Sequence, residues 1–331
     1  MTSLPDTSKP LSSEEALAAF SDLLDGRIDD DEQVARFLIG LTDRGETSEE
    51  IASAAQAMRD RLIPVKAPAN AIDVCGTGGD GHHTLNVSTA VSLVVAACDV
   101  PVAKHGNRAA SSKAGAADTL EALGLDLNRA AANAEATLND LGICFLFAAN
   151  YHPAMKWVMP IRQKIGRRTI FNLMGPLANP AQVKRQLLGI ARPAYIPIYA
   201  EALRQLGTEK SFVVSGDEGL DELSLAGGNE IAIVTPSGVQ MQRVDAVEIG
   251  LPPAPVEAIR GGDANENAKA LRLLLQGEKG PYRDAVLFNA AAALMVADEV
   301  DNFTDGVEEA AEAIDKGLAN TLLNCWIASS K

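Results

Sequence analysis

A glycine-rich stretch at residues 73–81 holds the first groups that could do chemistry. It reads Asp-Val-Cys-Gly-Thr-Gly-Gly-Asp-Gly. Its first three residues complete a short apolar run at 71–75 that is typical of a β-strand, and the glycines follow that run directly. Glycine lets backbone amides approach an anion closely and adopt positive φ. Residues 86–89, Asn-Val-Ser-Thr, stand at an expected helix start, where unpaired amides and the helix dipole favour phosphate. Together these segments predict an anion cradle, although a glycine-rich turn alone is often only a tight connection.

A second cluster follows another expected strand, at 100–103. It is Lys104-His105-Gly106-Asn107-Arg108-Ala109-Ala110-Ser111-Ser112-Lys113, with cations, an imidazole, an amide and hydroxyls. Ligands of parallel sheets bind at the carboxyl ends of the strands. In a chain whose formal net charge is −15, such a concentration of cations favours recognition of phosphate and ribose oxygens over a solvated basic face.

An acidic pair, Asp221 and Glu222, comes after an expected strand at 211–214. Carboxylates are the hard oxygen ligands that Mg²⁺ prefers, usually alongside waters and substrate oxygens. A charged surface turn is the alternative, but a site for a polyphosphate needs a metal. The histidines show no zinc-ligand spacing, and His82 and His83 are expected to be exposed loop residues.

Two kinds of element must position these groups. Helices are expected before residue 65, where Ser12 with Glu15 and Thr47 with Glu50 form capping-box patterns. Strands then alternate with helices, which implies a parallel sheet. The pattern predicts an α/β fold, with a small helical domain at 1–68 and a large α/β domain at 69–331 around a central, mostly parallel sheet. Further strands are expected at 143–147, 186–190 and 230–234, helices at 114–123, 129–141, 194–206 and through most of 265–323, and an irregular or hairpin-like segment at 236–255.

Composition narrows the class of protein. The 331 residues are 47% hydrophobic and 22% charged, which suits a globular chain. A net charge of −15 argues against long nucleic acids as partners. The longest apolar stretch, 91–103, contains Asp99 and is shorter than the ~20 residues of a membrane helix. The four cysteines form no Cys-x-x-Cys pair, so reduced thiols, a cytoplasmic location and no membrane attachment are expected.

Five motifs, by their order and spacing, resemble the anthranilate phosphoribosyltransferase family from about residue 10 to the end. They are Gly76-Thr77-Gly78-Gly79-Asp80-Gly81, Asn86-Val87-Ser88-Thr89, Lys104-His105-Gly106-Asn107-Arg108, Phe171-Asn172-Leu173-Met174-Gly175-Pro176-Leu177-x-Asn179-Pro180 and Asp221-Glu222.

The resemblance implies transfer of the phosphoribosyl group of phosphoribosyl pyrophosphate to the amine of anthranilate, in tryptophan biosynthesis. It also implies a nucleoside phosphorylase/phosphoribosyltransferase-like fold and a homodimer. The helical domain would take back a segment near 160–185.

The same resemblance implies a set of site residues, none of them a general acid or base. Those on the phosphoribosyl pyrophosphate side are Gly76, Gly79, Asp80, Thr84, Asn86, Val87, Ser88, Thr89, Lys104, His105, Gly106, Asn107, Arg108, Ala109, Ala110, Ser111, Ser112 and Ala116. Those on the anthranilate side are Gly76, Asn107, His152 and Arg162, with Arg162 meeting the carboxylate and His152 lining the access channel. Ser88, Asp221 and Glu222 would bind Mg²⁺, two ions per subunit.

Two positions depart from the family pattern, and two other functions stay open. Leu85 stands where the family usually has Phe, and Ala116 where a serine often contacts phosphate. A pyrimidine nucleoside phosphorylase is one alternative, but its lysine-serine signatures are not evident. A noncatalytic nucleic-acid-binding relative is the other. It would be expected to be basic and to lack the glycine loop and the acidic pair.

Overall fold

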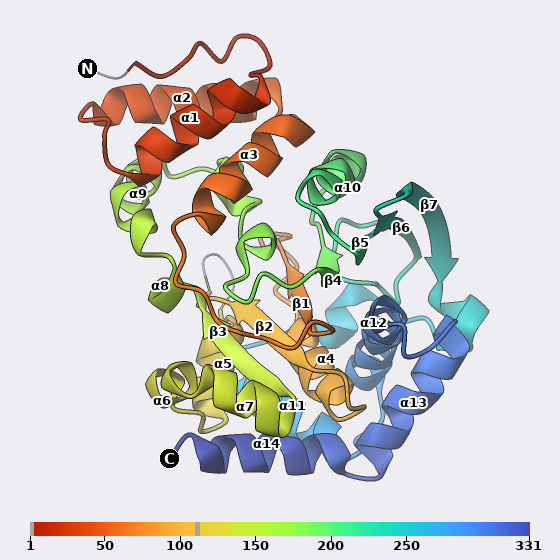
Figure 1. The fold of residues 1–331 in the computed structure, drawn as a ribbon. Coiled ribbons are helices and arrows are strands. Elements are labelled where there is room, and N and C mark those ends of the chain that lie inside the picture. The colour runs from red at the N-terminus through yellow and green to blue at the C-terminus, as the bar shows by residue number, and fades with distance from the viewer. Residues whose placement is uncertain (1–2, 110–112) are drawn as a thin grey trace.

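The N-terminal part of the chain is a helical module. The computed structural model describes residues 3–109 and 113–331. The module consists of α1 (Ser13–Leu24), α2 (Asp31–Arg44) and α3 (Ser48–Arg59), in red and orange in Figure 1. Both expected capping boxes are present, because Ser12 caps α1 with Glu15 and Thr47 caps α3 with Glu50. Local chemistry therefore sets where these two helices begin.

A sheet forms the centre of the rest of the chain. Within the described residues it has seven strands in the order β3-β2-β1-β4-β5-β6-β7. The first five in this order run parallel, whereas β6 and β7 pair antiparallel with their neighbours, so the predicted mostly parallel sheet is confirmed. The strands are β1 (Ile72–Gly76), β2 (Val102–Gly106), β3 (Ile143–Phe147), β4 (Arg185–Gly189), β5 (Lys210–Gly216), β6 (Gly228–Thr235) and β7 (Gly238–Asp245).

Three expected segments differ from the structure by more than a residue or two at their ends or in their form. The strand predicted at 100–103 is β2, which begins at Val102 because Pro101 has no N–H to donate to a ladder. Lys104 and His105 consequently lie within the strand and not just after it. The helix predicted at 129–141 is divided at Asn133 into two short helices. The segment at 236–255 is the strand β7 followed by a short 3₁₀ helix.

The remaining helices cover the sheet. None of the helices in the described residues has the length and apolar character needed to cross a membrane. The α-helices are α4 (Val87–Ala96), α5 (Ala116–Ala122), α6 (Leu127–Ala132), α7 (Ala134–Leu141), α8 (Ala148–Tyr151), α9 (Met159–Ile165), α10 (Ile196–Gln205), α11 (Ala264–Leu275), α12 (Pro281–Ala297), α13 (Phe303–Asp315) and α14 (Leu318–Ser329). The 3₁₀ helices are η1 (Pro153–Trp157), η2 (Ile170–Asn172), η3 (Pro176–Ala178), η4 (Pro193–Tyr195), η5 (Ala246–Ile249) and η6 (Val256–Ile259).

Two large apolar cores lie on opposite faces of the sheet. Successive side chains of a strand point to opposite faces, so Leu187 packs in the core beneath α4 and α12, and Leu188 packs in the other. That second core also contains residues of α1–α3, of α10 and of the segment at 158–178. Figure 1 shows α10 on the same side of the sheet as α3, with α4 and α12 on the far side. The division of the chain at residue 68 stays a prediction, since this core draws on residues from both sides of it.

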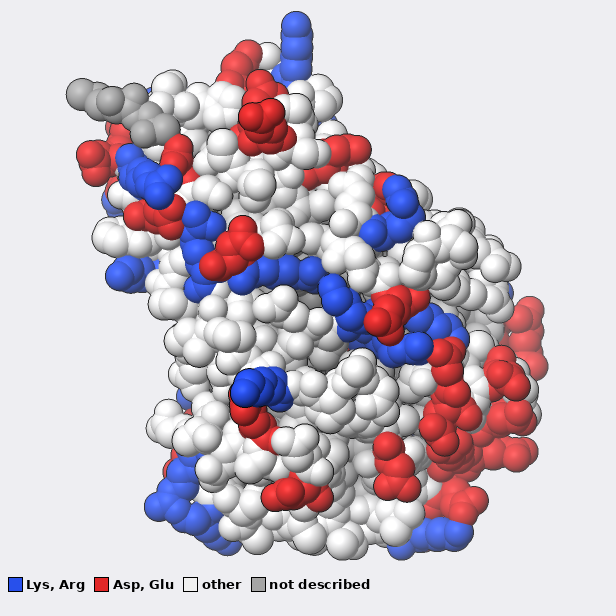
Figure 2. All heavy atoms as spheres, viewed as in Figure 1, with Lys and Arg blue, Asp and Glu red and all other residues white. Residues whose placement is uncertain are grey.

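Charge is unevenly distributed over the surface. Figure 2 shows a band of Lys and Arg across the middle of one face. On the same face, acidic side chains gather at the lower right of Figure 2, in the region where Figure 1 places α13. The excess of acidic residues is therefore partly segregated from the basic band on this face.

Candidate active site

A cleft of about 400 Å³ opens at the carboxyl ends of β1 and β2. Its walls come from the glycine loop after β1, the start of α4, the end of β2, the connection between β5 and β6, and the segment from α9 to η3. Most of the predicted site residues therefore meet in one cleft, although they come from distant parts of the sequence. Those lining it are Gly76, Gly79, Asp80, Thr84, Asn86, Val87, Ser88, Lys104, His105, Gly106, Asn107, Arg108, Ala109, Ala116, Arg162, Asp221 and Glu222.

Five predicted residues are not among those that line the cleft. Ala110, Ser111 and Ser112 lie outside the described residues. Thr89 is buried on α4, with 1% of its surface exposed. His152 is also buried and is hydrogen-bonded to His105, and its predicted place on an access channel stays a prediction.

The glycine loop owes its shape to positive φ angles and to one carboxylate. Gly78 and Gly79 have φ of +68° and +74°, a conformation that side chains rarely tolerate. The Gly78 amide donates a hydrogen bond of 2.6 Å to Asp221 Oδ2. A Cβ atom on Gly76 would lie 2.3 Å from the same oxygen, so the loop and the acidic pair must pack closely. The predicted anion cradle and the predicted metal ligands are thus in direct contact.

The acidic pair lies at the base of this loop. Glu222 Oε1 accepts a hydrogen bond of 3.1 Å from the Ser88 amide at the start of α4. Burial raises the pKa of both carboxyls, and Asp80 adds to the rise at Asp221. No group of three or more His, Cys, Asp or Glu side chains in the described residues is arranged to hold a metal by itself. Two carboxylates beside a serine instead fit Mg²⁺, which usually keeps waters and substrate oxygens as its other ligands.

Lys104 places a cation at the floor of the cleft. Its ammonium donates to the Val74 carbonyl at 2.7 Å and to Ser88 Oγ at 3.3 Å. Burial lowers the pKa of Lys104, and the buried carboxylate of Asp73 opposes that effect. The cation is therefore held in a fixed position between β1 and α4, where a phosphate could meet it.

His105 and His152 form a buried, hydrogen-bonded pair. His105 Nδ1 lies 2.8 Å from the Gly175 carbonyl, which can only accept, so Nδ1 carries the proton. His105 Nε2 must then accept from His152 Nε2, 3.2 Å away. Burial lowers the pKa of His105 to about 3 and that of His152 to about 4, so both rings are neutral at neutral pH. This pair holds Gly175 in the cleft wall.

The two arginines of the cleft differ in how they are engaged. Arg108 forms ion pairs with Asp118 and Glu121, so its charge is already largely balanced. Arg162, on α9, lies over the Phe171 ring at 5.7 Å and donates to Asn172 Oδ1 at 3.4 Å, and it has no carboxylate partner among the described residues. An anionic group of a substrate would therefore meet an unbalanced charge at Arg162.

Sequence reasoning missed two residues that support the site from outside the cleft, and it misjudged the exposure of two histidines. Gly189 ends β4, where a Cβ would lie 1.6 Å from the Asp221 backbone oxygen. Arg168 contacts the glycine loop from outside the cleft. A glycine at the end of an expected strand was a weak signal for Gly189, and nothing in the sequence indicated the role of Arg168. The prediction that His82 and His83 are exposed was wrong, since both are half-buried and His83 lines the cleft.

Comparisons with known proteins cover nearly the whole chain. Residues 68–320 match the family model described as the α/β domain of a glycosyl transferase family, and residues 6–62 match its helical bundle domain. The chain is 73% identical to the anthranilate phosphoribosyltransferase of Novosphingobium aromaticivorans, over 99% of each chain.

Solved structures extend the likeness to the fold. The crystal structure of anthranilate phosphoribosyltransferase from Thermus thermophilus is 42% identical, with a TM-score of 0.91, over 97% of this chain and 96% of that one. The Saccharomyces cerevisiae enzyme in complex with phosphoribosyl pyrophosphate and Mg is 29% identical, with a TM-score of 0.88, over 97% and 93%. On sequence and fold alike, this chain belongs to the anthranilate phosphoribosyltransferase family.

Proposed function

We propose that this chain transfers the phosphoribosyl group of phosphoribosyl pyrophosphate to the amine of anthranilate, giving N-(5-phosphoribosyl)anthranilate and pyrophosphate in tryptophan biosynthesis. One observation carries the proposal: a single cleft joins a glycine-loop anion cradle, a buried carboxylate pair and an arginine without a carboxylate partner among the described residues. These parts suit a polyphosphate, a divalent cation and a carboxylate-bearing acceptor, respectively.

The pyrophosphate end would be held by backbone amides and by Lys104. The loop amides that have no acceptor within the described residues, together with the positive end of the α4 dipole, stabilise negative charge as the bond from ribose C1 to oxygen breaks. Lys104 reaches the same region from β2 beside Ser88. Mg²⁺, when bound, neutralises the charge of the leaving pyrophosphate. Asp221, Glu222 and Ser88 are the residues that would hold it, and we propose two ions per subunit.

The anthranilate end would be held by Arg162, which lines the cleft from α9. Its guanidinium can pair with the carboxylate, which aims the amine at ribose C1. The amine nitrogen then forms the new bond to C1 while pyrophosphate leaves with the electron pair of the old one, and the amine proton is lost afterwards. Positioning and electrostatics supply the catalysis, so no side chain is assigned as a general acid or base. We propose that the enzyme works as a cytoplasmic homodimer.

Fluorescence of anthranilate provides the test. We expect its loss to require both phosphoribosyl pyrophosphate and Mg²⁺, and a chelator to stop it. The double variant Asp221→Asn with Glu222→Gln should lower turnover by about 100-fold or more at saturating substrate. Intact turnover in this variant would refute the metal role. Phosphorolysis of thymidine or uridine without consumption of anthranilate would instead identify a pyrimidine nucleoside phosphorylase.

A further inference from the structure

Arg168 contacts the glycine loop from a separate crevice, outside the cleft. It lies in the coil between α9 and η2 and is half-buried. Its Nη1 donates to the Gly79 carbonyl and its Nη2 to the Gly78 carbonyl, each at 3.2 Å. The guanidinium thus holds two successive carbonyls with its planar fork, a geometry that a lysine ammonium does not offer. Arg168 lines a small crevice behind the loop and is not among the residues that line the cleft.

Fixing these carbonyls also fixes the amides that follow them. In a trans peptide the C=O and the next N–H point in opposite directions. Holding the Gly78 and Gly79 carbonyls toward Arg168 therefore turns the amides of Gly79 and Asp80 the other way. Both of these residues line the cleft, and within the described residues neither amide donates a hydrogen bond. Two free donors thus face the space where an anion would bind.

The glycine loop needs contacts from other residues to fix its backbone. Gly78 and Gly79 both have positive φ, and glycine loses more conformational freedom on ordering than any other residue. Asp221 fixes one end of this short segment through the Gly78 amide. Arg168 supplies the matching restraint on the carbonyl side.

We propose that Arg168 is a positioning residue of the phosphate site, which orients the amides of Gly79 and Asp80 toward the pyrophosphate of the donor substrate. This inference rests on the proposed function. It predicts that Arg168 governs the binding of the donor, phosphoribosyl pyrophosphate, more than that of the acceptor, anthranilate.

The test compares Arg168→Gln with Arg167→Gln. Arg167 is the adjacent arginine, but its ion pair is with Asp43 on α2 and it does not touch the loop. Both variants remove one positive charge from the same segment, so general electrostatics are matched. Steady-state assays would give kcat and the two KM values, and thermal unfolding would report the fold.

We expect Arg168→Gln to raise KM for phosphoribosyl pyrophosphate by about 10-fold or more, and to change KM for anthranilate by less than about 2-fold. Arg168→Lys should restore the donor KM only in part, because an ammonium cannot hold both carbonyls in one plane. Arg167→Gln should stay within about 2-fold of wild type for both substrates. If Arg168→Gln does not fold, Arg168→Lys provides the same comparison.

Several results would overturn the positioning role. Equal donor KM values for Arg168→Gln and Arg167→Gln would show that the loop does not need Arg168. Full restoration of the donor KM by Arg168→Lys would show that only the charge matters. A lowered unfolding temperature without a change in KM would make Arg168 merely structural. By contrast, a wild-type protein that does not consume anthranilate would refute the proposed function itself.

Discussion

At the scale of single residues, Gly189 leaves no room for a side chain against the backbone of Asp221. Because a Cβ at Gly189 would lie 1.6 Å from the Asp221 carbonyl oxygen, Gly189→Ala must displace the main chain that carries the acidic pair. We expect a loss of stability of about 1–3 kcal/mol, together with weaker apparent Mg²⁺ affinity in the fluorescence assay. Gly227→Ala is the control, since no heavy atom lies within 4 Å of a Cβ there. Unchanged Mg²⁺ dependence in Gly189→Ala would contradict this prediction.

The buried histidine pair predicts how stability depends on pH. The pKa of His105 falls from 6.5 to about 3 and that of His152 from 6.5 to about 4 on folding, because both rings are buried. Below pH 6.5 these two histidines are protonated in the unfolded chain but remain neutral in the folded chain. The stability held at neutral pH is therefore lost as pH falls toward the folded values, by on the order of 1–2 kcal/mol per histidine down to pH 5. The free energy of unfolding, measured with urea between pH 7 and pH 5, should fall less steeply with pH in His152→Gln than in the wild-type protein. An equally steep fall in the two proteins would refute this assignment.

Residue types and order identified most of the groups that line the cleft, because phosphates and metals demand particular donors. The sequence could not reveal side chains that support the site by contacting its backbone. Arg168 is one of two adjacent arginines in the sequence, and only the fold brings it to the Gly78 and Gly79 carbonyls. The engagement of Arg108 by Asp118 and Glu121 likewise depends on how α5 packs.

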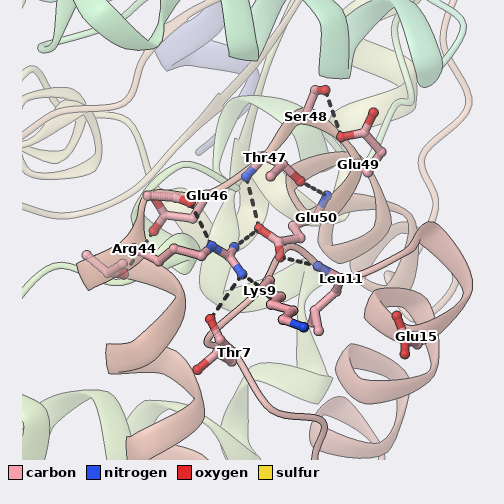
Figure 3. Close-up of polar contacts among 12 residues, drawn as sticks. Thr7, Lys9, Leu11, Glu15, Arg44, Glu46, Thr47, Ser48, Glu49 and Glu50 are labelled. Atoms are coloured by element: carbon pink, nitrogen blue, oxygen red, sulfur yellow. Dashed lines mark hydrogen bonds and ion pairs between the residues drawn. The ribbon is translucent and has the colours of Figure 1, made fainter.

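At the scale of elements, α2 and α3 are joined by a buried ion pair. Arg44 near the end of α2 pairs with Glu50 in the first turn of α3, and Glu50 also accepts from the amides of Leu11 and Thr47, each at 2.9 Å. Arg44 in turn donates to the Thr7 and Lys9 carbonyls. Figure 3 shows Arg44 and the amides of Leu11 and Thr47 converging on Glu50, so that the Glu50 side chain ties the N-terminal segment to both helices.

Removing Glu50 should therefore destabilise the helical module. Glu50→Ala leaves a largely buried arginine without its partner and two amides without an acceptor, so we expect a loss of about 3–5 kcal/mol in the free energy of unfolding. Urea unfolding followed by circular dichroism would measure it. Glu49→Ala, at the more exposed neighbouring position, should cost well under half as much. Equal losses in the two variants would show that the network contributes little.

Element boundaries were predictable where local chemistry decides them. The capping boxes at Ser12 and Thr47 correctly located two helix starts. The strand β7 was less clear, because its exposed side chains do not form a buried alternating pattern and its pairing with β6 is a property of the sheet. The Arg44–Glu50 pair was not foreseeable either, since the capping box accounts for Glu50 without any long-range partner.

At the scale of the whole molecule, the second core links the unfolding of the helical module to that of the sheet. It joins helices of the N-terminal module to strand residues such as Leu188 and Val213. Unfolding the module alone would expose this face of the sheet to water, at a cost that grows with the apolar area exposed. We therefore expect the module and the sheet to unfold together, although two family models divide the chain near residue 65.

The two tryptophans allow this expectation to be tested in the full chain. Trp157 packs against Gly26 at the end of α1, whereas Trp326 is buried in α14 within the first core. Trp326→Phe leaves Trp157 as the reporter of the module, and Trp157→Phe leaves Trp326 as the reporter of the α/β part. In each variant the urea midpoint from fluorescence should coincide with the midpoint from far-ultraviolet circular dichroism, because a cooperative transition gives one midpoint for every probe. Comparing probes within one variant removes the effect of the substitution on stability itself. A Trp157 transition at lower urea than the circular dichroism transition would instead show that the helical module unfolds first, as an independent domain.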